Sequence, residues 1–335
     1  MPDTTILVTG ATGYIGSALV QALHQQFGGR VHLKALVRKT SSRDILAGFP
    51  VEFVAGDVSD PASLWRATEG VDVVFHVAAL VSYQQLDFRK LYKVNVLGTR
   101  SLIDACLKND VKRLIHTSSV AAVGVLWDGA LNTESAAFQD WQHRFGYMES
   151  KYLAELEVLR GVAEGLDAVM VNPGVVIGQY PESRLKMHEA SKLLLNIYEG
   201  KIPYCPVGGV GFVDIEDVVK SHVAAWKHGK TGERYNIVSE NLSYKGLFDC
   251  IATFAYSRSR TAVPLNRWVG RMAGGASELF SAVMGRTATV TLDAVRLTER
   301  KLYFDSTKSK EELGLSYRPV DETIEGMLKA HSRLL

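Results

Sequence analysis

Residues 9–16 read Thr-Gly-Ala-Thr-Gly-Tyr-Ile-Gly, and this stretch decides the class of fold. It follows the apolar run Ile6–Val8 and precedes a helical pattern of apolar residues. A strand, a glycine turn and a helix in this order form the context of a dinucleotide-binding loop. In such a loop Gly10 permits the tight turn, Gly13 lets the backbone approach a pyrophosphate, and Gly16 lets the helix pack closely. We therefore expect the first helix to offer N–H groups to phosphates.

The composition is that of a globular chain without a charge bias. Its 335 residues suffice for a large core and for about two domains. Hydrophobic residues make up 47% and charged residues 22%, which is typical of a globular protein. The net charge of +2 gives no reason to expect nucleic acid or an anionic membrane as a partner.

Cysteine usage and hydropathy favour a cytoplasmic protein without a metal site. Cys106, Cys205 and Cys250 are far apart and lack metal-ligand spacing, which suits a reducing compartment. No secretory signal precedes the first expected strand, and no run of about 18 apolar residues predicts an integral membrane segment. The stretch Trp268–Met284 predicts an amphipathic helix over a pocket or the core, with peripheral membrane contact as a minor alternative.

Apolar strands alternate with helices along the first half of the chain. This alternation predicts a parallel sheet covered on both faces, that is, an α/β Rossmann fold with a doubly wound parallel sheet. The expected strands are Thr5–Val8, His32–Val37, Val51–Ala55, Val73–Val77, Arg113–Thr117, Ala168–Asn172, Gly211–Val213 and Glu233–Val238. The expected helices are Gly13–Gln25, Pro61–Thr68, Phe88–Asn109, Gly146–Ala163, Arg184–Tyr198, Asp217–His228, Ser243–Ala255 and Arg267–Met284.

The second half is less regular, and glycine and proline cluster in its middle. Ser306 could cap a further helix that runs to Leu313 and that the following glycine closes. We expect a nucleotide-binding Rossmann domain at residues 1–178, with later contributions from about 211–240. Residues 179–335 would form most of a smaller, mostly helical and discontinuous substrate lobe.

The end of the second expected strand bears on which dinucleotide is bound. An acidic residue about 20 positions after the glycine loop usually holds the ribose hydroxyls, and here no acid appears before Asp44. Arg38 stands at that place, and its planar guanidinium suits a 2′-phosphate. We therefore favour NADP (NADPH) over NAD. The alternative is that Arg38 is a solvated surface side chain.

Residues after the third and fourth expected strands could also meet the cofactor. Asp57 could accept from the adenine amino group, with Val58 against the ring, or it could cap the helix that begins near Pro61. Small side chains at residues 77–79 would let the cofactor pass, whereas His76 is expected to be packed and hydrogen-bonded rather than catalytic.

Tyr147 and Lys151 open an expected helix and share one face of it. A phenol has a pKa of about 10, and a neighbouring ammonium lowers that pKa. Tyr147 can then act as general acid–base on a carbonyl or hydroxyl while hydride moves to or from the cofactor, and Lys151 could bind the nicotinamide ribose. The alternative is two exposed helix residues. Ser118 or Ser119 places a hydroxyl at the carboxyl end of the sheet, where it could polarise the substrate oxygen.

These residues together resemble the extended short-chain dehydrogenase/reductase family, over nearly the whole chain. The family's catalytic serine lies five residues before a glycine, here Gly124, so the resemblance selects Ser119. It also implies a Rossmann core with a small C-terminal substrate lobe, and a homodimer formed through helices such as Phe88–Asn109 and Gly146–Ala163. The resemblance is weak from Ser243 to Lys301. The matching segments are residues 9–16, 56–58, 76–79, 95–99, 118–119, 124, 147, 151, 173–174, 212–218, 232–236 and 312–314.

Within that family the chain looks like dihydroflavonol reductases and 3β-hydroxysteroid dehydrogenases. Dehydratases usually carry an Asp-Glu pair after the catalytic hydroxyl, but Val120 and Ala121 follow it here. Sugar-nucleotide enzymes often carry an arginine two residues before the aromatic residue of a later strand, and here Val210 takes that place ahead of Phe212. A buried diphosphate needs cationic partners. Other cations could substitute: Arg184, Lys186 and Arg258.

We therefore expect an NADP-dependent oxidoreductase that interconverts a carbonyl and a secondary alcohol on an apolar small molecule. A nucleotide-sugar epimerase that retains NAD(P) is the second hypothesis, and a non-catalytic NADP-binding regulator is a third. The expected substrate pocket, whose members ordinary packing between two lobes could also explain, comprises Val81, Tyr83, Ser119, Trp127, Val175 and Tyr204. The expected cofactor residues are Gly10, Thr12, Gly13, Tyr14, Ile15, Gly16, Arg38, Asp57, Val58, Val77, Ala78, Ala79, Tyr147, Lys151, Pro173 and Val175.

Overall fold

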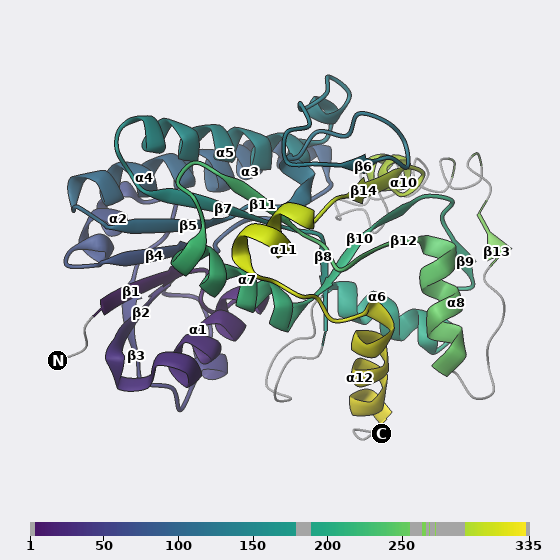
Figure 1. Cartoon of the computed structure of the whole chain (residues 1–335), viewed down its shortest axis with the longest axis horizontal. Coiled ribbons are helices and arrows are strands. Elements are labelled where there is room, and N and C mark those ends of the chain that lie inside the picture. The colour runs from purple at the N-terminus through teal and green to yellow at the C-terminus, as the bar shows by residue number, and fades with distance from the viewer. Residues whose placement is uncertain are drawn as a thin grey trace.

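The computed structural model describes residues 4–178, 189–254, 263–265 and 292–332, together with Trp268 and Met272. This part of the chain forms a layered α/β domain and a smaller lobe beside it (Figure 1). Apart from Trp268 and Met272, the expected helix at residues 267–284 lies outside the described residues, as does the start of the one at 184–198. None of the described helices is long and apolar enough to cross a membrane.

A seven-stranded sheet forms the centre of the larger domain, in the order β11-β7-β5-β4-β1-β2-β3. All neighbouring strands in it run parallel, as the alternating pattern predicts. The chain order reverses between β1 and β4, and in open α/β sheets ligands bind at the carboxyl edge beside such a reversal. The strands are β1 (Thr4–Thr9), β2 (Val31–Val37), β3 (Val51–Ala55), β4 (Val73–His76), β5 (Arg113–Thr117), β7 (Ala168–Pro173) and β11 (Arg234–Ile237).

Helices cover both faces of this sheet (Figure 1). Leu19 and Val218 join one apolar core on the face of α1 and α7, while Leu102 and Val158 join the core on the other face. Because both faces are buried, the strands are apolar almost throughout rather than alternating. The helices are α1 (Tyr14–Phe27), α7 (Ile215–His228) and α11 (Thr307–Leu313) on the first face, and α2 (Pro61–Thr68), α4 (Gly98–Lys108) and α5 (Gly146–Ala163) on the second.

The single helix expected at residues 88–109 is divided in the structure. A short α3 (Phe88–Leu91) leads into a π-helical turn at Tyr92–Leu97, and α4 continues from it. Asn95 within this turn accepts from Leu80 N at 2.8 Å and donates to Leu80 O at 2.9 Å. The wide turn therefore ties the helix to the loop that follows β4, at the carboxyl edge of the sheet.

The smaller lobe combines helices with a mixed sheet of five strands. Gly314, with a φ of 67°, ends α11 as expected. Ser306 is the N-cap residue of that helix by position, as expected, but its side chain makes no capping hydrogen bond. Its hydroxyl donates instead to Val238 O at 2.8 Å and joins the helix to the end of β11. The lobe's elements are β6 (Leu131–Asn132), β8 (Val175–Ile177), β9 (Tyr204–Cys205), β10 (Gly209–Asp214), β12 (Glu240–Ser243), β13 (Val263–Pro264), β14 (Lys301–Phe304), α6 (Glu189–Tyr198), α8 (Tyr244–Phe254), α10 (Leu292–Thr298) and α12 (Val320–Ser332).

Candidate active site

The glycine turn after β1 brings three backbone segments into contact. Gly10 has a φ of 66°, and a Cβ there would lie 2.7 Å from Ala78 N, so only glycine fits between the two loops. A Cβ on Gly16 would lie 2.2 Å from Gly10 O, which explains the close packing of α1. Gly13 begins α1 without a side-chain cap, and no acidic residue lies in the first turn. This exposed helix start therefore fits a phosphate group.

Arg38 lies at the same edge of the sheet as the glycine turn. Its strand pairs with β1 so that Leu36 faces Thr9, which places Arg38 one residue past the end of β2 and beside the turn. The side chain is exposed, and no ion pair joins it to any residue in the described part of the chain. The guanidinium is thus available to a phosphate on the ribose of a bound dinucleotide.

Asp57 lies after β3 and does not cap the next helix. Its carboxylate accepts from Ser59 N at 2.8 Å, whereas Asp60 accepts from Ala62 N at 3.2 Å and is the actual N-cap of α2. The helix is therefore capped by Asp60, three residues after the Asp57 that the sequence offered as a possible cap. Val58 beside it is buried against Gly98 of α4.

His76 at the end of β4 is packed and hydrogen-bonded, as expected. Its Nδ1 lies 2.8 Å from Thr9 Oγ1 and its Nε2 lies 3.0 Å from Thr99 Oγ1. Thr99 donates its own proton to Asn95 O at 2.6 Å, so the histidine donates from Nε2 and accepts at Nδ1. Burial, followed by the charge of Lys151, lowers the pKa of His76 to about 3, which keeps this ring neutral.

The two serines after β5 have different partners. Ser118 is buried and donates to Glu155 Oε1 at 2.6 Å, so its hydroxyl is already engaged. Ser119 is half-buried, its Oγ accepts from Ala121 N at 3.1 Å, and its hydroxyl lies close enough to Tyr147 to favour a lower pKa of that phenol. The structure thus joins Ser119, and not Ser118, to the phenol.

Tyr147 and Lys151 are both buried at the start of α5. Burial raises the pKa of Tyr147, Tyr83 adds to this effect, and the hydrogen bond from Ser119 opposes it. The net change is opposite to the lowering expected from the sequence, because loss of solvation outweighs the favourable contacts. Lys151 donates to Thr117 O at 2.8 Å, and burial lowers the pKa of its ammonium to about 8 while Glu155 raises it.

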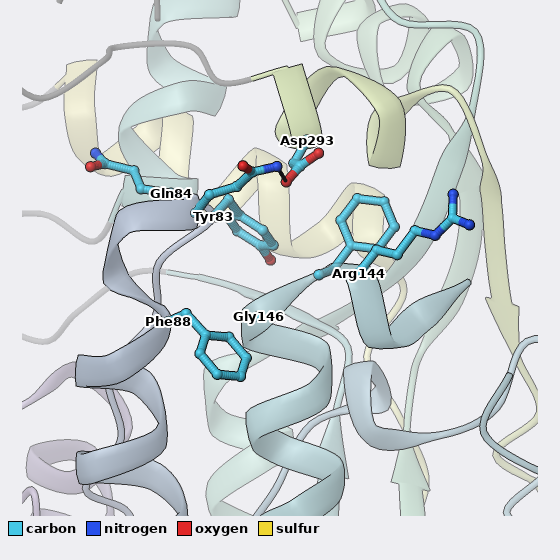
Figure 2. Close-up of a pocket in the computed structure, with 8 residues that line it drawn as sticks. Tyr83, Gln84, Phe88, Arg144, Gly146 and Asp293 are labelled. Carbon is cyan, nitrogen blue, oxygen red and sulfur yellow. Dashed lines mark hydrogen bonds between the residues drawn. The ribbon is translucent and has the colours of Figure 1, made fainter. Parts of the chain in front are cut away.

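A pocket of about 200 Å³ opens beside the start of α5. Tyr83 and Phe88 lie on one side of it and Arg144 on the other (Figure 2). Gln85 Nε2 donates to Asp293 Oδ2 at 2.9 Å, which joins the loop after β4 to α10 across 208 positions of sequence. The ring of Tyr83, which lines the pocket, packs edge-on against the ring of Tyr147, with centroids 5.7 Å apart.

Among the expected pocket residues, Tyr83 and Ser119 thus interact with Tyr147. Val81 is exposed in the same loop, while Trp127 and Tyr204 are 75% and 54% exposed. Tyr204 belongs to β9, which pairs with β13 in the smaller lobe. The remaining expected cofactor residues lie at or just after the carboxyl ends of β1, β4 and β7: Thr12, Tyr14, Ile15, Val77, Ala79, Pro173 and Val175.

Sequence reasoning missed Asp293, Gln85 and Glu155. Gln85 and Asp293 are joined by a hydrogen bond between segments that are far apart in the sequence. The local pattern of residues cannot predict such a contact. Glu155 follows Lys151 by one helical turn, and this i, i+4 spacing was a signal that could have revealed it.

Comparisons with known proteins place the chain among families of known enzymes. A model of the NAD dependent epimerase/dehydratase family matches residues 6–238. The chain is 34% identical, over 95% of its length and 91% of the relative, to a Synechocystis sp. protein named "Putative dihydroflavonol 4-reductase". It is 32% identical to "Sterol demethylase protein B" of Methylococcus capsulatus, with 93% of each chain covered. The crystal structure of gox2253 superposes with a TM-score of 0.83 at 34% identity, covering 99% of this chain and 98% of that one.

Proposed function

The chain belongs to the NAD dependent epimerase/dehydratase family, and we propose that it is an NADP-dependent reductase of an apolar carbonyl compound. Its relatives are named reductases and dehydrogenases, in keeping with an NAD(P)-dependent oxidoreductase. The observation that carries the proposal is that Ser119, Tyr147 and Lys151 come together at the carboxyl edge of the sheet, where Tyr147 packs against Tyr83 of a pocket with aromatic walls. The names of two relatives, which refer to a dihydroflavonol and a sterol, support an apolar ring compound as substrate.

In this proposal Tyr147 donates a proton to the carbonyl oxygen of the substrate. Its raised pKa keeps the phenol protonated at neutral pH, which suits the reductive direction. Ser119 donates a second hydrogen bond to the same oxygen and stabilises the negative charge that develops there. NADPH, when bound, supplies the hydride.

Lys151 would bind the ribose hydroxyls of the cofactor and hold positive charge next to the phenol. Its ammonium donates to Thr117 O, which holds it at the carboxyl end of β5. The uncapped start of α1 at Gly13 would hold the pyrophosphate, and Arg38 would hold the 2′-phosphate.

The substitution Tyr147→Phe tests the proposed proton transfer. We expect kcat for NADPH-dependent ketone reduction to fall by about 10²- to 10⁴-fold, because the proton donor is lost. The dissociation constant for NADPH, measured by fluorescence titration, should stay within about twofold because the ring and Lys151 remain. The matched control is Tyr152→Phe, a tyrosine of the same helix that stacks on Phe138 away from Ser119.

Two outcomes would contradict the proposal. One is full reductase activity in Tyr147→Phe. The other is a wild-type protein that keeps its nucleotide tightly bound and interconverts nucleotide sugars without net consumption of NADPH, which would indicate the epimerase.

A further inference from the structure

Glu155 is a buried carboxylate on α5, one turn beyond Lys151, with 3% of its side chain exposed. Its Oε1 accepts from Ser118 Oγ at 2.6 Å and from Asn172 Nδ2 at 2.5 Å. Its Oε2 pairs with Arg234 Nη1 at 2.8 Å. An ionised group this deeply buried requires such partners, and their placement links α5 to β5, β7 and β11.

We infer that Glu155 is a positioning residue. It fixes the segment that places Ser119 beside Tyr147, and it supplies a negative charge that balances the Lys151 ammonium. This inference rests on the proposed reductase function of the same site. Glu155 touches neither the pocket beside Tyr83 nor the glycine turn in the described residues, so it acts through its neighbours.

The link to Ser119 runs through two hydrogen bonds. Ser118 Oγ is held directly by Glu155. Asn172 Nδ2 donates both to Glu155 Oε1 at 2.5 Å and to Ser119 O at 3.0 Å. The backbone before and after the Ser119 amide is thereby fixed, and a displacement of about 1 Å at a reacting group can cost about 100-fold in rate.

The link to Lys151 is electrostatic. Burial lowers the pKa of the ammonium to about 8, and the Glu155 carboxylate on the same helix opposes that change. The titratable groups that face Lys151 from the other elements are His76 on β4 and His116 on β5, and burial keeps both rings neutral. Glu155 is therefore the group whose charge holds the ammonium in its protonated form near neutral pH.

The test compares Glu155→Gln with Glu157→Gln. Loss of the carboxylate lowers the pKa of Lys151, so the ammonium is lost at a lower pH. We expect the basic limb of the kcat/KM profile to move about one pH unit toward acid, and kcat at pH 7.5 to fall about 10- to 100-fold. Glu157 lies on the same helix but pairs with Arg100 and Arg160, so its variant should leave the basic limb in place.

The double variant Glu155→Gln/Arg234→Gln covers the case in which the single variant fails to fold. It removes both charges of the buried pair, so no unpaired cation remains, and it should move the basic limb toward acid by less than the single variant does, because the Arg234 cation no longer disfavours the ammonium. Ser118→Ala removes only the link to the strand end. Because the Glu155 carboxylate remains in that variant, kcat should fall while the basic limb of the kcat/KM profile stays in place.

A readout that does not need turnover separates this inference from the proposed function. The Lys151 side chain can be titrated by NMR in the NADPH complex, with its signal assigned through Lys151→Arg. We expect its pKa to fall by about one unit in Glu155→Gln. An unchanged Lys151 titration in the folded variant would overturn the inference, whereas absence of ketone reduction by the wild type would overturn only the reductase proposal.

Discussion

Burial shifts the pKa values of Tyr147 and Lys151 in opposite directions, and both shifts favour the neutral side chain. It raises the pKa of the phenol and lowers that of the ammonium, because a site with little water favours the neutral form of each group. For Tyr147 the neutral form is the proton donor that a carbonyl reduction needs. Lys151, in contrast, acts in the proposal as a charged ammonium. The Glu155 carboxylate raises the pKa of this group and so opposes the effect of burial.

At the same scale, Arg38 is expected to set the preference for NADPH. In Arg38→Asp the guanidinium is lost and a carboxylate would repel the 2′-phosphate, so the dissociation constant for NADPH should rise about 10- to 100-fold. NADH affinity should stay the same or improve, as measured by fluorescence titration. Arg43→Asp is the control, because Arg43 lies over the ring of Phe53 at 5.0 Å instead. Equal affinity of the wild type for NADPH and NADH would contradict the assignment.

At the scale of elements, the strand ends near the site bury three neutral histidines. His76 lies on β4, His116 on β5, and His222 on α7 accepts from Thr117 Oγ1 at 2.7 Å. Burial is the largest cause in each case: it lowers the pKa of His76 to about 3, that of His222 to about 4, and that of His116 well below its usual value. In the folded protein these three histidines therefore stay unprotonated at a pH at which the unfolded chain would protonate them.

This arrangement predicts a loss of stability in mild acid. Unfolded histidine titrates near pH 6.5, so the stabilisation is complete above that pH and declines as the pH falls below it. At pH 5.5 each excluded proton should cost about 1.4 kcal/mol, or about 4 kcal/mol for the three histidines. Urea unfolding at pH 7.5 and at pH 5.5 measures the difference.

Two variants identify the histidines as the cause. His222→Gln should reduce the pH dependence by about one third, even if it lowers stability at both pH values. His228→Gln, at the exposed end of the same helix, should leave the pH dependence unchanged. A pH dependence that is the same in all three proteins would refute the explanation.

At the scale of the whole molecule, the pocket lies between the large domain and the smaller lobe. Tyr83 and Gly146 come from the first, and Asp293 comes from α10 of the second. The hydrogen bond from Gln85 to Asp293 crosses this boundary, so the shape of the pocket depends on how the lobes meet (Figure 2).

We also propose that the molecule forms a homodimer through the outer faces of α4 and α5. Leu97 precedes α4 and is 37% exposed, while Leu156 on α5 is 43% exposed. Exposed large apolar side chains on helices that lie on the outside of the domain favour a protein contact. Leu156→Arg should convert a dimer to a monomer in light scattering, and Leu131→Arg, at an exposed leucine on β6, should not. A monomeric wild type would exclude the dimer.

The sequence by itself determined the parts that depend on neighbours along the chain. The glycine turn at residues 9–16, the alternation of strands and helices, and the shared face of Tyr147 and Lys151 follow from local spacing, so they could be predicted. The mixed sheet of the smaller lobe could be predicted only in part from the sequence. Its strands are short, and the strands that pair are far apart along the chain.

Only the tertiary structure decided which groups meet. It assigned Ser118 to Glu155 and Ser119 to Tyr147, made Asp60 the helix cap, and brought Asp293 to the pocket. It also reversed the expected change in the pKa of Tyr147. The physical reason is that hydrogen bonding and loss of water depend on contacts between distant segments, which form only when the chain has closed around them.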